Sequence, residues 1–88
     1  MRPYTQKLMS ENLILMEFSD EVSSEELEWH MDRRDRRIKV LECNGWKLQL
    51  ESGLPFEMKL HEEYSIPKKS WHRVIKGTGS LKILISET

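Results

Sequence analysis

The sequence predicts an all-β domain, folded as a small antiparallel sandwich or barrel. Apolar and polar side chains alternate in several short runs, a pattern typical of strands with one buried face. Turn-forming residues separate these runs at intervals of about 8–12 residues, as in β-sandwiches and barrels. The chain has 88 residues. That length suits one domain, residues 1–88, with a compact core and about seven or eight short strands.

The composition is that of a soluble globular domain without a strong charge bias. Apolar residues make up 38% and charged residues 33% of the chain, and the formal net charge is −1. This charge excludes a basic protein that holds nucleic acid by its overall field, so we expect no nucleic-acid partner. The longest apolar run, residues 13–16, is too short to span a membrane. With no signal-peptide pattern and a single cysteine, Cys43, we expect a cytoplasmic protein without an internal disulfide.

The first half of the chain contains three predicted strands. Residues 13–18 form an apolar strand, and the polar residues 19–26 are typical of a turn. Residues 37–42 and 46–51 then show period-2 alternation. Asn44-Gly45 lies between these last two strands, and this dipeptide is typical of tight hairpins because both residues tolerate positive φ. The sequence therefore predicts a hairpin at this point.

The second half continues the same pattern. Further short strands are predicted at residues 56–60, 63–67, 71–75 and 81–86, with turns between them. The apolar positions of all these runs make up the predicted core: Leu13, Leu15, Leu27, Trp29, Ile38, Val40, Trp46, Leu48, Leu50, Phe56, Met58, Leu60, Tyr64, Ile66, Val74, Leu81, Ile83 and Ile85.

The segment from residue 27 to 37 admits two interpretations. Ser23 and Glu26 have the spacing of a helix capping box, so a helix could begin here. However, the apolar residues Leu27, Trp29 and Met31 recur with period 2, which favours a strand. In a strand, side chains two positions apart share a face, so the residues at 30 and 32 would point to the same side.

Residues 61–75 resemble the second of two sequence motifs of the cupin superfamily. That motif consists of glycine, five residues, Pro-x-Gly, two residues and a metal-binding histidine. Here His61, Pro67, Lys69 and His72 stand at its four defined positions. Lysine in place of glycine is a conformational change, because glycine readily supplies the positive φ that such turns use.

Residues 30–43 resemble the first cupin motif more loosely. That motif consists of His-x-His, three or four residues, glutamate, six residues and glycine. His30 matches the first histidine, while Asp32, Arg36 and Cys43 replace the second histidine, the glutamate and the glycine. The replacement by Arg36 exchanges a carboxylate ligand for a cation.

The resemblance covers residues 27–85 and implies a small antiparallel β-barrel, a jelly roll of the cupin type. The stretches "WHMDRRDR" and "IPKKSWHRVIKG" are also similar to small uncharacterised cupin-like proteins of tailed phages that infect marine bacteria. In such a barrel, we expect His61 to lie exposed in a turn and Cys43 to be a structural thiol, since no catalytic cysteine signature surrounds it.

The resemblance further implies a metal site in the barrel mouth. His30, Asp32 and His72 would meet there, and two histidines with one carboxylate form a set that holds iron(II) with open positions. Iron, nickel, zinc and manganese are the expected candidates. A small unidentified ligand would bind beside the metal, where Arg36 would orient an anionic substrate, and Arg73 and Trp71 are further candidates for contacts with the ligand. Whether the protein is an enzyme stays open.

A metal-free interpretation uses the same residues. The cation of Arg36 disfavours a divalent ion nearby, and a guanidinium can form a bridge to an aspartate instead. The domain would then be a structural or interaction module without catalytic activity. In both cases we expect a homodimer formed through the N-terminal segment, because small cupins often dimerise through edge strands and an exposed edge otherwise invites aggregation.

Overall fold

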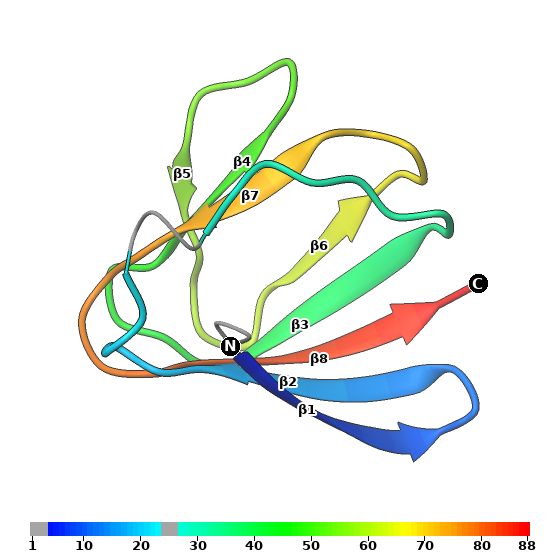
Figure 1. Ribbon diagram of the computed structural model, residues 1–88, viewed down its shortest axis with the longest axis horizontal. Coiled ribbons are helices and arrows are strands. Elements are labelled where there is room, and N and C mark those ends of the chain that lie inside the picture. The colour runs from blue at the N-terminus through cyan, green and yellow to red at the C-terminus, as the bar shows by residue number, and fades with distance from the viewer. Residues whose placement is uncertain (1–3, 24–26) are drawn as a thin grey trace.

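Eight antiparallel strands form two sheets in the computed structural model, which describes residues 4–23 and 27–88. In chain order they are β1 (Tyr4–Ser10), β2 (Leu13–Phe18), β3 (Arg36–Glu42), β4 (Lys47–Leu50), β5 (Phe56–Glu57), β6 (Glu63–Ile66), β7 (His72–Ile75) and β8 (Leu81–Glu87). The five-stranded sheet has the order β1-β2-β8-β3-β6, and the three-stranded sheet has the order β5-β4-β7. The sheets face each other across an apolar core (Figure 1). The predicted all-β class is confirmed.

Two strands differ from the sequence prediction. β1 was not predicted, because all of its residues after Tyr4 are exposed and they show no alternation. Its pairing with β2 gives it strand structure without a buried face. β5 ends at Glu57, so the predicted strand over residues 56–60 is too long. Within the two described ranges, no helix has the length and apolarity that crossing a membrane requires.

The core lies between the two sheets and largely matches the predicted residues. Leu50, Tyr64 and Val74 are half-buried and pack against it. The predicted core residues that are buried are Leu27, Ile38, Val40, Trp46, Leu48, Met58, Ile66, Leu81, Ile83 and Ile85.

The predicted inward face of β2 is wrong. Met16 and Phe18 are buried, whereas Leu13 and Leu15 are only half-buried. This strand is apolar on both faces, so alternation could not select the face that meets the core. A shift of one residue exchanges the two faces completely.

Three other predicted core residues are exposed. Trp29, Phe56 and Leu60 keep 38%, 36% and 53% of their surface accessible. Trp29 packs its ring against the guanidinium of Arg73 outside the core. Leu60 follows the end of β5, where regular alternation stops. Phe56 lies in β5, an edge strand, and packs against the ring of Tyr64.

The turn at Asn44-Gly45 is not a hairpin, which corrects the prediction. Gly45 has the expected positive φ of 75°, but β3 pairs with β6 and β8 while β4 pairs with β5 and β7. The turn therefore carries the chain from one sheet to the other. It is held from outside by the β7–β8 connection, where the Thr78 amide donates to the Asn44 carbonyl.

Two non-glycine residues adopt the left-handed conformation at positions where the cupin motif has glycine. His61 has φ 67° and Lys69 has φ 61°. Each amide makes a backbone hydrogen bond there, from His61 to the Val40 carbonyl and from Lys69 to the Asp32 carbonyl. Both residues thus adopt a turn geometry that glycine favours, at a conformational cost.

Replacing Lys69 with glycine is expected to stabilise the protein. Glycine removes a left-handed penalty of about 1–2 kcal/mol, partly offset by the greater freedom of glycine in the unfolded chain, so the free energy of unfolding should rise by about 0.5–1 kcal/mol. Urea unfolding measures this change. Lys68→Gly, at a neighbouring exposed residue without positive φ, should lower the stability instead, and an equal loss in both variants would contradict the assigned cost.

Candidate metal centre

The segment that leads into β3 is extended and runs beside β7. His30 and His72 form an antiparallel bridge in which each amide donates to the other's carbonyl, at 3.0 and 2.9 Å. Farther along, the Lys69 amide donates to the Asp32 carbonyl at 2.7 Å. The described residues 27–35 thus favour the strand interpretation over the helix. Glu26 of the suggested capping box lies outside the described residues.

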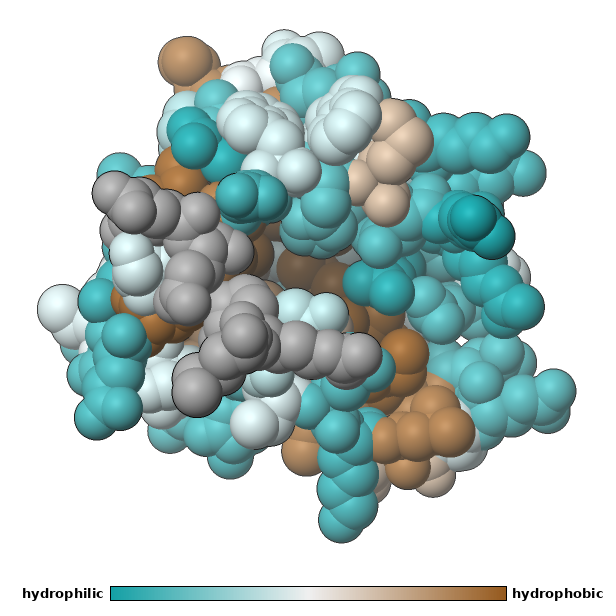
Figure 2. All heavy atoms as spheres, in the orientation of Figure 1, coloured by the Kyte–Doolittle hydropathy of each residue, from teal (hydrophilic) through white to brown (hydrophobic). Residues whose placement is uncertain are grey.

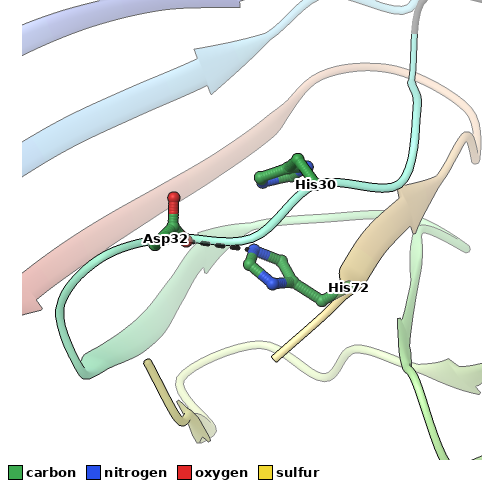
Figure 3. A group of neighbouring side chains, drawn as sticks. All are labelled: His30, Asp32 and His72. Carbon is green, nitrogen blue, oxygen red and sulfur yellow. Dashed lines mark ion pairs between the residues drawn. The ribbon is translucent and has the colours of Figure 1, made fainter. Parts of the chain in front are cut away.

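These backbone bonds bring three predicted ligands together. His30, Asp32 and His72 each offer one ligand atom, and these atoms lie within 4.8 Å of one another. The two imidazole rings meet nearly edge to face, with centroids 4.2 Å apart. His72 Nε2 lies 3.2 Å from Asp32 Oδ2. Figure 3 shows His30 and Asp32 on one segment with the ring of His72 reaching toward them from β7.

Both rings are oriented by a backbone carbonyl two residues earlier. Nδ1 of His30 lies 3.1 Å from the Glu28 carbonyl, and Nδ1 of His72 lies 3.1 Å from the Ser70 carbonyl. Because a carbonyl only accepts, each Nδ1 must carry the proton. In the neutral rings Nε2 is then the free acceptor. Metal-binding histidines are commonly held in this way, since the bond fixes both tautomer and ring orientation.

Asp32 has an unsatisfied oxygen at the centre of the cluster. Oδ2 is buried and accepts no well-aligned hydrogen bond, although His72 Nε2 and Arg36 Nη1 approach it to 3.2 and 3.4 Å. Burial opposes ionisation, but His72, Arg36 and His30 outweigh it and hold the pKa of Asp32 below its ordinary value of 3.8. The carboxylate and the neutral Nε2 of His72 are both acceptors, and two facing acceptors repel each other. A cation between them, either a proton or a metal ion, would remove this repulsion.

Arg36 lies beside the cluster and is already paired. Its Nε donates to Glu87 Oε2 at 2.8 Å, and its Nη1 faces Asp32. Arg36 and Glu87 are register partners in the β3–β8 pair. Glu87 was not predicted as part of the site, although it continues the inward positions of Leu81, Ile83 and Ile85 along β8.

A pocket of about 370 Å³ opens beside the cluster. Its polar lining consists of His30, Asp32, His72 and Arg36, together with Gln6 and Glu28. In Figure 2 apolar side chains line a hollow on the face shown. The rest of the lining is apolar or aromatic: Tyr4, Met16, Phe18, Leu27, Trp29, Ile38, Leu48, Ile66, Val74, Ile83 and Ile85.

Trp71 and Arg73 lie away from this pocket, unlike the other predicted site residues. They flank His72 along the chain, and in a strand neighbouring side chains point to opposite faces. Trp71 is 45% exposed, and Arg73 donates to Gln49 Oε1 while its guanidinium lies over the ring of Trp29. Neither residue is among those lining the pocket, so the structure does not join them to the cluster.

The remaining candidates stand apart from the site. Cys43 is half-buried and its thiol donates to the Met58 carbonyl. Burial, with the charge of Glu57, raises the pKa of the Cys43 thiol. A raised pKa disfavours the reactive thiolate, in line with the structural role expected for this residue. His61 is exposed in the turn before β6.

Comparison with known structures identifies the fold. A cupin domain from Bordetella pertussis superposes with a TM-score of 0.65 at 16% identity, covering 100% of this chain and 97% of that one. An RmlC-like cupin with a double-stranded β-helix fold from Methanocaldococcus jannaschii gives 0.69 at 11% identity, covering 99% and 82%. The chain therefore has the cupin fold, a jelly roll of the double-stranded β-helix type.

Larger proteins share this fold with the chain. The iron(II) form of HppE superposes with a TM-score of 0.70 at 14% identity, covering 97% of this chain and 48% of that one. A structure of the DMSP lyases RdDddP and RnDddQII gives 0.73 at 11% identity, covering 85% of this chain. This chain spans only 36% of the matched lyase. No protein-family model matches the sequence, and no curated protein matches it.

Proposed function

We propose that the protein binds a divalent transition-metal ion through His30, Asp32 and His72, and a small ligand in the adjoining pocket. The observation that carries the proposal is the shared arrangement of the two histidines. Both Nδ1 atoms are fixed to backbone carbonyls, which leaves both Nε2 atoms free as acceptors, and that of His72 lies 3.2 Å from a buried carboxylate oxygen of Asp32. One ligand atom from each of the three side chains lies within 4.8 Å of the others, and such a grouping favours a cation.

The chemistry of the ligand atoms suits several metals. Two imidazoles and one carboxylate are typical of non-haem iron(II) centres with open positions, and imidazole also suits zinc and nickel. The iron(II) form of HppE supports iron as the first candidate, with nickel, zinc and manganese as alternatives. A bound ion of this kind supplies Lewis-acid polarisation of a ligand oxygen or, for iron, redox chemistry.

We further propose that the ligand is small and mainly apolar, with one polar group directed at the cluster. The pocket is lined mainly by aliphatic and aromatic side chains, and pockets of this size suit small molecules. Arg36 already contacts two carboxylates. We therefore expect it to order the site rather than to hold an anionic substrate.

The similarity to small cupin-like proteins of tailed phages, which the sequence suggests, stays a prediction.

Metal titration tests this proposal. Chelator-treated protein should take up about one equivalent of iron(II), nickel, zinc or manganese per chain, with a rise in thermal stability because the ion binds only the folded state. Trp71→Ala is the matched control, since Trp71 adjoins His72 but lies outside the pocket, and it should bind equally. Uptake below about a tenth of an equivalent with no thermal shift would overturn the proposal.

A metal-free structural role is the second candidate. The contacts of Asp32 Oδ2 with His72 and Arg36 form a charged cluster that a protonated His72 would complete without any metal. The same titration separates the two roles. A protein that binds no metal, but in which His72→Ala lowers the free energy of unfolding sharply, would support this second candidate.

We expect the predicted homodimer to form through β1. This strand is at the end of the five-stranded sheet, and Leu8 and Met9 at its end are 67% and 50% exposed. Sedimentation at micromolar concentration should show a dimer, because exposed edge strands favour pairing. Leu8→Lys should shift the sample toward monomer. A wild-type monomer across the concentration range would contradict the prediction.

A further inference from the structure

We propose that Arg36 sets the metal affinity of the cluster by competing with the ion for Asp32, and that Glu87 weakens this competition. The inference rests on the metal site proposed above. It concerns residues outside the three ligands, and assigns a role to the arginine that stands where the cupin motif has a carboxylate ligand.

The competition is visible in the contacts of a single oxygen. Asp32 Oδ2 lies 3.4 Å from Arg36 Nη1 and 3.2 Å from His72 Nε2. Oδ2 thus faces the histidine with which it would share an ion. Any metal bound to Oδ2 must approach close to the guanidinium. The two cations would then compete for one buried acceptor.

The charge on Arg36 is permanent and only partly screened by water. A guanidinium does not lose its proton in proteins, so binding cannot remove the repulsion by deprotonation. The side chains of Arg36 and Asp32 are only 20% and 15% exposed, and charges interact more strongly at such partly buried positions than in bulk water. A divalent ion would therefore bind more weakly in the presence of Arg36 than in its absence.

Glu87 holds Arg36 from the other side. Its Oε2 lies 2.8 Å from Arg36 Nε, closer than Asp32 Oδ2 lies to Nη1. The register of β3 against β8 fixes this pairing. Glu87 thus supplies a second carboxylate that keeps Arg36 paired when a metal ion takes Asp32. It also offsets the charge that repels the ion.

Removing Arg36 should leave Asp32 in place. The backbone at Asp32 is held by the bond from the Lys69 amide at 2.7 Å, and the neighbouring bridge joins His30 to His72. Neither contact involves the guanidinium. The substitution therefore removes a competing cation from an otherwise intact set of ligands.

Calorimetric titration of chelator-treated protein with zinc and nickel tests the inference. Arg36→Met should tighten binding by about tenfold or more, which equals ~1.4 kcal/mol. Glu87→Gln should weaken binding about threefold or more, and this effect should shrink in the double variant because Glu87 acts through Arg36. Arg37→Met is the control, since Arg37 is the exposed neighbour on the other face of β3, and it should change affinity by less than about twofold.

Each outcome bears on the two proposals separately. Binding by wild-type protein with no tightening in folded Arg36→Met would overturn this inference and leave the metal site standing. Binding by Arg36→Met alone would support the inference and overturn metal binding by the wild-type protein. No binding by either would overturn both. Should Arg36→Met fail to show a native circular dichroism spectrum, Glu87→Gln decides, and unchanged or tighter binding in that variant would overturn the inference.

Discussion

Replacing His30 with alanine is expected to weaken metal binding by about 100-fold or more while the protein stays folded. Loss of a group that merely supports a ligand typically costs 10–100-fold in affinity, and loss of a ligand should cost at least as much. His30 is exposed, so removal of its ring should lower the free energy of unfolding of the metal-free protein by less than about 1 kcal/mol. Calorimetric titration and urea unfolding measure the two quantities.

Two further variants define how this result is interpreted. Met31→Ala changes the adjacent residue, which is 42% exposed and does not line the pocket, and should bind metal as the wild-type protein does. His72→Ala should lose binding as well, and also destabilise the metal-free protein by about 1–3 kcal/mol, because a buried partner of Asp32 is removed. Full affinity in His30→Ala would show that the ion lies elsewhere.

Replacing Gly77 with alanine is expected to destabilise the whole fold. A Cβ at this position would lie 2.4 Å from the Asn44 carbonyl oxygen and 2.4 Å from the Trp46 amide nitrogen. Both atoms belong to the backbone, so no side chain can rotate away. We expect a loss of about 3 kcal/mol or more. The entire stability of a domain of this size is roughly 4–13 kcal/mol, so thermal unfolding should detect the change easily.

Gly53 provides the matched control for this substitution. A Cβ there has no atom within 4 Å, so Gly53→Ala should leave the melting temperature nearly unchanged. Equal melting temperatures for Gly77→Ala and the wild-type protein would show that the β7–β8 connection does not pack against the sheet-to-sheet turn as described.

Alternation predicted most strands because one face of each meets the core. β3 and β8 show this most clearly, with Ile38 and Val40 inward on one and Leu81, Ile83 and Ile85 inward on the other. The same rule failed in β2, where both faces are apolar. It also failed for β1, whose strand structure comes from pairing with β2 and leaves no pattern of burial in the sequence.

The pairing of strands was less predictable than their existence. The Asn44-Gly45 signal correctly indicated positive φ, but the same turn can close a hairpin or carry the chain to another sheet. Here the turn is held by the β7–β8 connection, more than thirty positions along the chain, whose Thr78 amide donates to the Asn44 carbonyl. Because that contact joins residues far apart in the sequence, the pattern around Asn44-Gly45 could not predict it.

The candidate site was predicted in part. The cupin-like spacing together with period 2 placed His30, Asp32 and His72 at one point, as the structure does. Period 2 also implied that Trp71 and Arg73 face away from His72, a consequence that the ligand-contact prediction overlooked. Glu87 could have been found by extending the inward positions of β8 by one step.

The extended segment that carries His30 and Asp32 has a consequence for motion. It is outside both sheets and is tied to β7 and the turn before β7 by three backbone bonds, those between His30 and His72 and that from Lys69 to Asp32. Because so few backbone hydrogen bonds hold it, this segment should open locally more often than the strands of the two sheets. The amide protons of His30, His72 and Lys69 should therefore exchange with deuterium earlier than those of β8. A metal ion bound by His30, Asp32 and His72 would join this segment to β7 and should slow the exchange of all three amide protons together.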